Sequence, residues 1–168
     1  TKALKLDPSY SLVWANLAQV FSVTGQLDKA KKSFKNILNI EPKNGLIWAE
    51  YGTVLTKLAN YKDGRDAYLK ALEFKPNSPR VHLSLGHVYK TMGEINNSIN
   101  SYKNTIIQNN LSGEAYWSLA NLKTYSFSEN EIIDMEETLK SNMSDIERSQ
   151  MHFALGKAYE VKKDFDKS

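Results

Sequence analysis

The chain has 168 residues, of which 41% are hydrophobic and 24% are charged, and it contains no cysteine. This is the composition of a folded domain, and it excludes a disulfide scaffold, a thiolate metal site and a cysteine nucleophile. The net charge is +3, but only three of the 22 basic residues are arginines, so we expect no nucleic-acid partner. No apolar run approaches the roughly 18 residues that span a bilayer, and we therefore expect no membrane insertion.

A period of 34 residues organises most of the chain. A small residue recurs at this interval, at Ala18, Gly52, Gly86 and Ala120. Bulky residues stand four positions before each of them, at Trp14, Trp48, His82 and Tyr116. The same interval separates three aromatic residues in the second half of each unit, at Phe34, Tyr68 and Tyr102. Several columns that keep one register over three periods indicate an internal repeat.

Each unit predicts two helices. From Ser11 the apolar residues follow the 3, 4 and 7 spacing of one helical face, and Gly25 ends this first helix. The second helix continues until Pro42, because proline cannot extend a helix. Asn44 and Ser78 are the expected N-caps of the next two units. The small-residue column has a steric reason, since a larger side chain would hold the paired helices apart.

A 34-residue helix–turn–helix unit with these columns resembles the tetratricopeptide repeat (TPR). The resemblance implies an all-α fold, a right-handed superhelix of antiparallel helix pairs, with residues 1–168 forming a single array. The expected divisions are the tail of a preceding repeat at 1–10, regular repeats at 11–44, 45–78 and 79–112, a divergent repeat at 113–143, and the start of a truncated repeat at 144–168.

The period slips after residue 112. Two capping boxes, at 128–131 and 144–147, predict two further helices. Gly156 follows Ala120 by 36 residues, so two residues are inserted relative to the repeat. A last helix is expected to begin at Phe165 and to be cut off by the end of the chain.

The divergent end resembles one group of proteins more closely. The run EAYWSLANLK at 114–123, then Phe127 and Met135, then FALGKA at 153–158, is similar to bacterial proteins in which tetratricopeptide repeats precede a sulfotransferase domain. The resemblance implies a bacterial protein in which this segment lies next to a catalytic domain. No glycine-rich phosphate loop between a strand and a helix is present, so we expect that this chain is not an enzyme and binds no cofactor.

No metal site is expected. His82 and His87 are five residues apart, which turns them about 140° from each other on a helix, whereas zinc pairs favour a spacing of four. His82 stands in the tryptophan column and is most simply a core residue. With no signal peptide at the start, the expected location is the cytoplasm.

The concave face of such an array, lined by the first helices, is the candidate binding site. Counting along the register predicts that it contains Leu12, Ala15, Gln19, Leu46, Ala49, Thr53, Lys57, Arg80, Leu83, His87, Lys90, Trp117 and Asn121. This surface changes from apolar to basic around Arg80, His87 and Lys90. Trp117 is either an exposed anchor for a ligand or is packed beneath the inserted residues of the fourth unit.

Three functions follow as hypotheses. The first is non-catalytic recognition of a protein or peptide ligand in the concave groove. The second is an accessory arm of a bacterial sulfotransferase, which would position the acceptor or a dimer partner. The third is self-association into a homo-oligomer, because the open ends of an array expose apolar faces.

Overall fold

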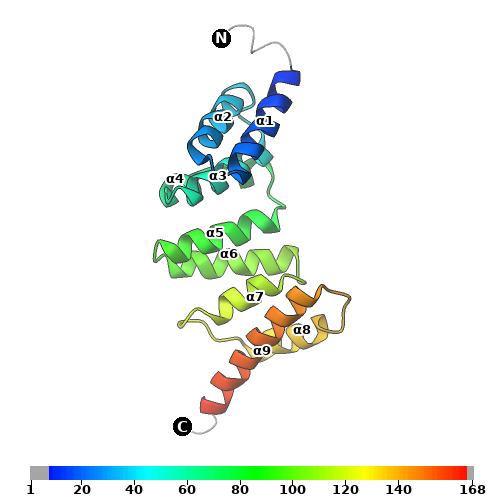
Figure 1. Ribbon diagram of the computed structural model, residues 1–168. Coiled ribbons are helices and arrows are strands. Elements are labelled where there is room, and N and C mark those ends of the chain that lie inside the picture. The colour runs from blue at the N-terminus through cyan, green and yellow to red at the C-terminus, as the bar shows by residue number, and fades with distance from the viewer. Residues whose placement is uncertain (1–7, 166–168) are drawn as a thin grey trace.

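The computed structural model describes residues 8–165, without the side chains of residues 8–10, 12 and 163–165. In this range all regular structure is helical, in nine helices (Figure 1). The helices are α1 (Pro8–Val23), α2 (Leu27–Ile40), α3 (Gly45–Lys57), α4 (Tyr61–Phe74), α5 (Pro79–Thr91), α6 (Ile95–Gln108), α7 (Gly113–Ala120), α8 (Glu129–Thr138) and α9 (Asp145–Phe165). None of these described helices is long and apolar enough to cross a membrane.

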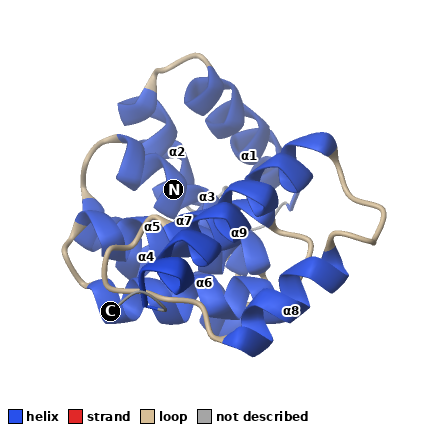
Figure 2. Ribbon diagram, turned by 90° about the horizontal axis from the view of Figure 1, so that it is seen from below, coloured by secondary structure: helices blue, strands red, loops and turns tan. Residues whose placement is uncertain are grey.

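The helices are stacked as antiparallel pairs. Pairs α1/α2, α3/α4 and α5/α6 follow one another along the molecule, and α1 and α9 lie at its opposite ends (Figure 1). Seen along this direction, the helices overlap as successive layers joined by short loops (Figure 2). Each layer therefore contacts its neighbours in the sequence, which is how a solenoid is built.

The turn inside each regular pair has a left-handed residue. Gly25, Ala59 and Gly93 have φ values of 76°, 60° and 77°, and they are 34 residues apart. Glycine adopts this conformation without steric strain, whereas Ala59 adopts it with its Cβ present. The repeat is therefore visible in the backbone as well as in the side chains.

Paired helices approach closely because the first helix carries a glycine or alanine opposite an aromatic ring. A Cβ atom on Gly52 would lie 2.8 Å from the Tyr68 ring, and one on Gly86 would lie 2.3 Å from the Tyr102 ring. In the first pair Ala18 and Phe34 are both buried. The steric reason inferred for the small-residue column is confirmed.

The last helices depart from this pattern. α7 has only eight residues, and α9 lies beside it in the same direction, so that Gly113 meets Glu147 and Asn121 meets Lys157. The backbone N–H of Gly113 donates a hydrogen bond to the Glu147 carboxylate. A Cβ atom on Gly113 would lie 2.1 Å from the backbone oxygen of Glu147. Only glycine therefore fits where α7 begins.

Two of the expected helix starts are capped as the sequence predicts. The Asn44 side chain accepts a hydrogen bond from the backbone of Ile47, and Ser128 and Glu131 form a complete capping box at α8. Burial alone would raise the pKa of Glu131, but hydrogen bonds from Tyr125 and Ser128 outweigh it, and the net pKa of this carboxyl is lowered.

Three other expectations have a different outcome. Ser78 precedes α5 as expected, but its side chain makes no capping hydrogen bond. Ser144 accepts a hydrogen bond from the backbone N–H of Glu147, yet the Glu147 carboxylate turns to Gly113, so this capping box is only half formed. The expectation that Phe165 begins another helix is wrong, because α9 extends to that residue. The tail predicted at 1–10 lies largely outside the described residues, and the division into repeats stays a prediction.

Candidate recognition surface

The first helices present an apolar column three residues before each small residue. Its members are Ala15, Ala49, Leu83 and Trp117, and the register extends it to Phe153 on α9. The side chains grow in size along the molecule, from alanine to two aromatic rings. We call the surface formed by this column and its neighbours on the first helices the recognition face.

The recognition face ends in a hollow lined by large apolar side chains. Trp117, Ile146 and Phe153 are 43%, 72% and 66% exposed, and they line an open hollow of about 460 Å³ together with polar residues of α9. We call this site the aromatic hollow. Trp117 is therefore exposed and is not packed beneath the inserted residues of the fourth unit, while its role as an anchor stays a prediction. Exposed aromatic side chains in a concavity are typical anchor points for a binding partner.

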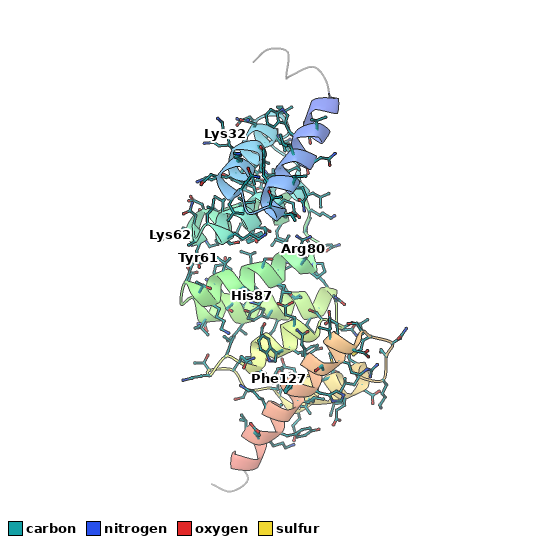
Figure 3. All side chains as sticks on the ribbon, viewed as in Figure 1. Lys32, Tyr61, Lys62, Arg80, His87 and Phe127 are labelled. Atoms are coloured by element: carbon teal, nitrogen blue, oxygen red, sulfur yellow. The ribbon has the colours of Figure 1, made fainter. Side chains whose placement is uncertain are left out.

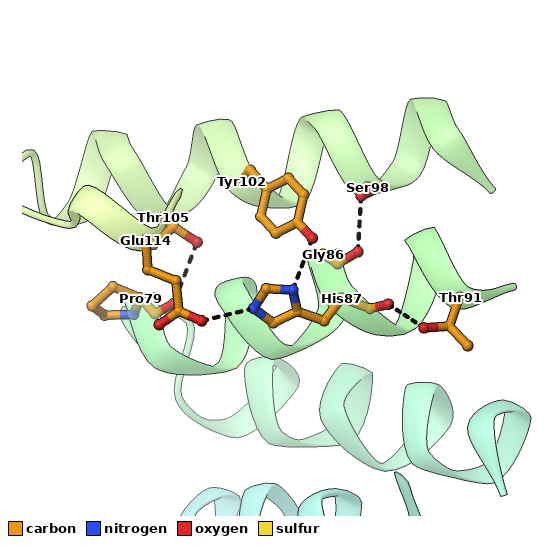
Figure 4. A network of polar contacts seen from close by, with 8 residues as sticks. All are labelled: Pro79, Gly86, His87, Thr91, Ser98, Tyr102, Thr105 and Glu114. Atoms are coloured by element: carbon orange, nitrogen blue, oxygen red, sulfur yellow. Dashed lines mark hydrogen bonds and ion pairs between the residues drawn. The ribbon is translucent and has the colours of Figure 1, made fainter. Parts of the chain in front are cut away.

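A polar column flanks the apolar one. Thr53 follows Gly52, and His87 follows Gly86, both members of the small-residue column. Each side chain is hydrogen-bonded to the tyrosine that packs on that glycine. The Thr53 hydroxyl lies 3.1 Å from the Tyr68 hydroxyl, and the His87 Nδ1 lies 2.9 Å from the Tyr102 hydroxyl (Figure 4). These hydrogen bonds connect the tyrosines of α4 and α6 to side chains of α3 and α5 on the recognition face.

Contacts between neighbouring layers place carboxylates beside two of the three expected basic residues. An Arg80 nitrogen lies 3.1 Å from the Glu50 carboxylate, and the His87 Nε2 lies 3.2 Å from the Glu114 carboxylate (Figure 4). Arg80 and His87 both lie on α5 (Figure 3). Lys90 is exposed on α5 and has no ion pair with a described residue. The change from apolar to basic is therefore weaker at Arg80 than the sequence predicted, because the Glu50 carboxylate, 30 residues away, faces the guanidinium.

The remaining predicted site residues vary in exposure. Gln19, Leu46 and Lys57 are exposed, whereas Ala15, Ala49, Thr53, Leu83 and Asn121 are half-buried. The Lys157 ammonium donates a hydrogen bond to the Asn121 side-chain oxygen at 2.9 Å. Leu12 lies in α1, but its side chain is outside the described part of the chain.

Two observations concern metal ligands and His82. The described residues contain no group of three His, Asp or Glu side chains that could hold a metal ion. His82 is half-buried, and burial lowers its pKa, which favours the neutral ring expected of a core residue.

Comparisons with known proteins agree on the fold. A family model of the TPR repeat matches residues 52–93, and a family model of the tetratricopeptide repeat matches residues 1–32. Among 204 matching chains of solved structures, two crystal structures of MamA are 20% and 17% identical, with TM-scores of 0.67 and 0.70. The first match covers 99% of this chain and 86% of the MamA chain, and the second covers 96% of this chain and 91% of the MamA chain. The TPR domain of Arabidopsis OM64 is 11% identical, with a TM-score of 0.63, over 66% of this chain and 91% of its own.

The chain has the all-α solenoid fold of tetratricopeptide-repeat proteins. No curated protein matches the sequence, so these likenesses are limited to the fold. In the predicted division into repeats, α1, α3, α5 and α7 are first helices, and α2, α4 and α6 are the second helices of the regular repeats. The matches reported above do not show the resemblance to sulfotransferase-linked repeats.

Sequence reasoning missed two members of the recognition face of this TPR solenoid, Phe153 and Ile146. The signal for Phe153 was present, since it precedes Gly156 by three residues, as Trp117 precedes Ala120. The two-residue insertion concealed it, because counting by 34 from Trp117 leads to Met151, which is fully buried. Ile146 has no equivalent signal, since its exposure depends on how α9 lies beside α7.

Proposed function

We propose that this chain is a non-catalytic scaffold that binds a protein or peptide segment on its recognition face, with the aromatic hollow as the main anchor. The TPR fold is typical of protein-interaction scaffolds. One observation supports the anchor: Trp117, Ile146 and Phe153 come from two helices and are exposed around one hollow.

The chemistry of the face suggests the kind of ligand. The apolar column offers contact to alternate side chains of an extended segment, and the column that contains Thr53 and His87 offers hydrogen-bond partners beside it. The hollow of about 460 Å³ beside Trp117, Ile146 and Phe153 has room for a large apolar side chain. We therefore propose a peptide that presents one or two large apolar residues.

Selection of peptides from a random displayed library tests this function. The selected peptides should share a large apolar residue, and Trp117→Ala should weaken their binding at least about tenfold, as expected for an anchor residue. Ile107→Ala is the control, because Ile107 is exposed on α6, outside these columns. Selected peptides that bind Trp117→Ala as well as the unchanged chain would contradict the proposal.

An alternative proposal is that the chain is an accessory arm of a bacterial sulfotransferase, which positions the acceptor or a dimer partner of the enzyme. Its support is the sequence run at 114–123 and 153–158. In an enzyme that carries this segment, deletion of residues 1–168 should reduce sulfation of a protein acceptor without affecting a small acceptor. Equal loss with both acceptors would contradict the arm. A cytoplasmic location is part of the same proposal.

Self-association is a second candidate, favoured by the outer face of α1. Val13, Leu17 and Val20 form an exposed apolar stripe at the i, i+4 and i+7 spacing of one helical face. The equivalent positions of α5 are Val81, Leu85 and Val88, which are buried against the preceding layer. Self-association predicts that the molar mass measured by light scattering rises with concentration. In Leu17→Glu the molar mass should stay at the value of the monomer. A constant mass would exclude it.

A further inference from the structure

We propose that a polar pocket between the second and third helix pairs binds a carboxamide side chain, that of asparagine or glutamine, from a segment held on the recognition face. The pocket has a volume of about 190 Å³, smaller than the usual site of a drug-sized ligand and suited to a single side chain. Its lining contains the hydroxyl side chains Thr56, Tyr61, Tyr68, Ser84 and Thr91, together with His87. We call this site the hydroxyl pocket. Its link to a bound segment rests on the proposed function, because the pocket shares His87 with the recognition face.

The repeat does not require hydroxyl groups at this place. The residues one period before and after Tyr61 are Leu27 and Ile95, and both pack as apolar side chains against a core cluster. The residue one period before Tyr68 is Phe34, which is buried and carries no hydroxyl. Helix pairs of this chain therefore form with apolar side chains at both positions. The hydroxyl pocket is a feature of one layer of the molecule and is not a consequence of the repeat.

Three hydroxyl oxygens of the pocket can accept a hydrogen bond from a ligand. Thr56 and Thr91 donate their hydroxyl hydrogens to backbone carbonyls of their own helices, both at 2.9 Å (Figure 4 shows Thr91). The Tyr68 hydroxyl lies 3.1 Å from the hydroxyl of Thr53. Because Thr53 donates its own hydrogen to a backbone carbonyl of α3, Tyr68 is the donor in this pair. Each of the three oxygens thus keeps lone pairs for a ligand.

The pocket also offers two hydroxyl donors and carries no fixed charge. The hydroxyls of Tyr61 and Ser84 make no hydrogen bond with a described residue, so both can donate to a ligand. The two nitrogen atoms of His87 are already bonded, to Tyr102 and Glu114. Among the described residues that line the pocket, none is aspartate, glutamate, lysine or arginine.

This set of donors and acceptors matches a carboxamide. A carboxylate, a phosphate or an ammonium group would lose its water in the pocket without gaining an opposite charge, which is costly. An apolar side chain would leave the hydroxyl groups without partners. A carboxamide is neutral and has two N–H donors and one carbonyl acceptor. Its N–H groups would donate to the oxygens that keep lone pairs, and its carbonyl would accept a hydrogen bond from Ser84 or Tyr61.

The test uses the complete 168-residue chain, labelled with ¹⁵N, and the probe Nα-acetyl-glutamine N-methylamide. The probe should shift the amide resonances of Ser84 and Thr91 in a saturable way, with a dissociation constant in the millimolar range expected of so small a ligand. The matching glutamate and leucine probes should bind at least about tenfold more weakly at pH 7. The absence of a saturable shift, or equal binding of either of these two probes, would overturn the proposal.

Thr91→Val removes one acceptor from the pocket with little change of shape. It should weaken binding of the glutamine probe about threefold to tenfold. Thr24→Val is the matched control, because the Thr24 hydroxyl also donates to a backbone carbonyl four residues earlier, at 2.8 Å, but lies after α1 and outside the pocket. Both threonines are exposed, and circular dichroism should show an unchanged fold in both variants. Unchanged binding by Thr91→Val, or an equal loss in Thr24→Val, would overturn the proposal.

Failure of this proposal can be distinguished from failure of the proposed function. Trp117→Ala should leave binding of the glutamine probe intact. Peptides selected by display should carry asparagine or glutamine at a constant distance from their large apolar residue. Peptides that need Trp117 but share no carboxamide would overturn the role of the hydroxyl pocket and support the aromatic hollow. Peptides that share a carboxamide and bind Trp117→Ala equally well would support the pocket and contradict the hollow.

Discussion

The contact between α7 and α9 determines the geometry of the aromatic hollow on the recognition face, and a single substitution at Gly113 tests it. Gly113 lies against the backbone of Glu147, and its N–H bonds to the Glu147 carboxylate. We predict that Gly113→Ala forces α9 away from α7, because a Cβ atom would lie 2.1 Å from a backbone oxygen that no side-chain rotation can move. The aromatic hollow, which both helices line, would then lose its geometry.

The magnitude can be worked from the contacts. Overpacking costs about 1–3 kcal/mol, and loss of a hydrogen bond to a charged group costs about 1.5–3 kcal/mol. The gain in helix propensity from glycine to alanine is at most about 1 kcal/mol. The net loss in the free energy of unfolding should be about 2–4 kcal/mol, which lowers the Tm by about 5–15 °C in a chain of this size.

Gly156→Ala is the matched control for this prediction. It makes the same chemical change in a helix, at a site where the added Cβ contacts nothing within 4 Å. It should raise the free energy of unfolding by about 0.5–1 kcal/mol. Urea unfolding followed by circular dichroism measures both variants. A Gly113→Ala chain as stable as the unchanged one would refute the close contact between α7 and α9.

Three further predictions concern polar contacts. Glu131→Gln should destabilise the fold by about 1–2 kcal/mol at pH 7, measured by urea unfolding. Because folding lowers the pKa of Glu131, this difference in stability should be present above pH about 4.3 and should disappear at lower pH. Tyr102→Phe removes the hydrogen bond to His87 and should cost about 0.5–1.5 kcal/mol in thermal unfolding; no change would mean that the bond is absent in solution. Arg80→Ala should change the free energy of unfolding by less than about 0.5 kcal/mol, because its ion pair with Glu50 is exposed, and a loss above about 1 kcal/mol would contradict this description.

The regular part of the fold could be predicted from the sequence because its information is local. The small-residue column and the helix cap at Asn44 depend on residues within one repeat, and the structure confirms both. The ion pairs of Arg80 and His87 join side chains 27 to 30 residues apart, so their partners could not be read from the register. The expected surface was therefore too basic.

The divergent end shows a second limit of sequence reasoning. The capping-box pattern at 144–147 is correct as a helix start, but Glu147 bonds to Gly113 in another helix instead of to its own N-cap. Phe153 could have been found from Gly156, whereas the hollow that it lines with Trp117 depends on the direction of α9 beside α7. A local pattern predicts the helix, and the tertiary contact determines the surface.

The most direct test of the proposed function observes Trp117 itself while a ligand binds. The chain contains three tryptophans, so labelling with 5-fluorotryptophan gives three ¹⁹F resonances, and Trp117→Phe identifies one of them. Addition of a peptide selected by display should shift the Trp117 resonance in a saturable way and leave those of Trp14 and Trp48 unchanged. Saturable binding that shifts Trp14 or Trp48, or that leaves Trp117 unaffected, would contradict recognition at the aromatic hollow.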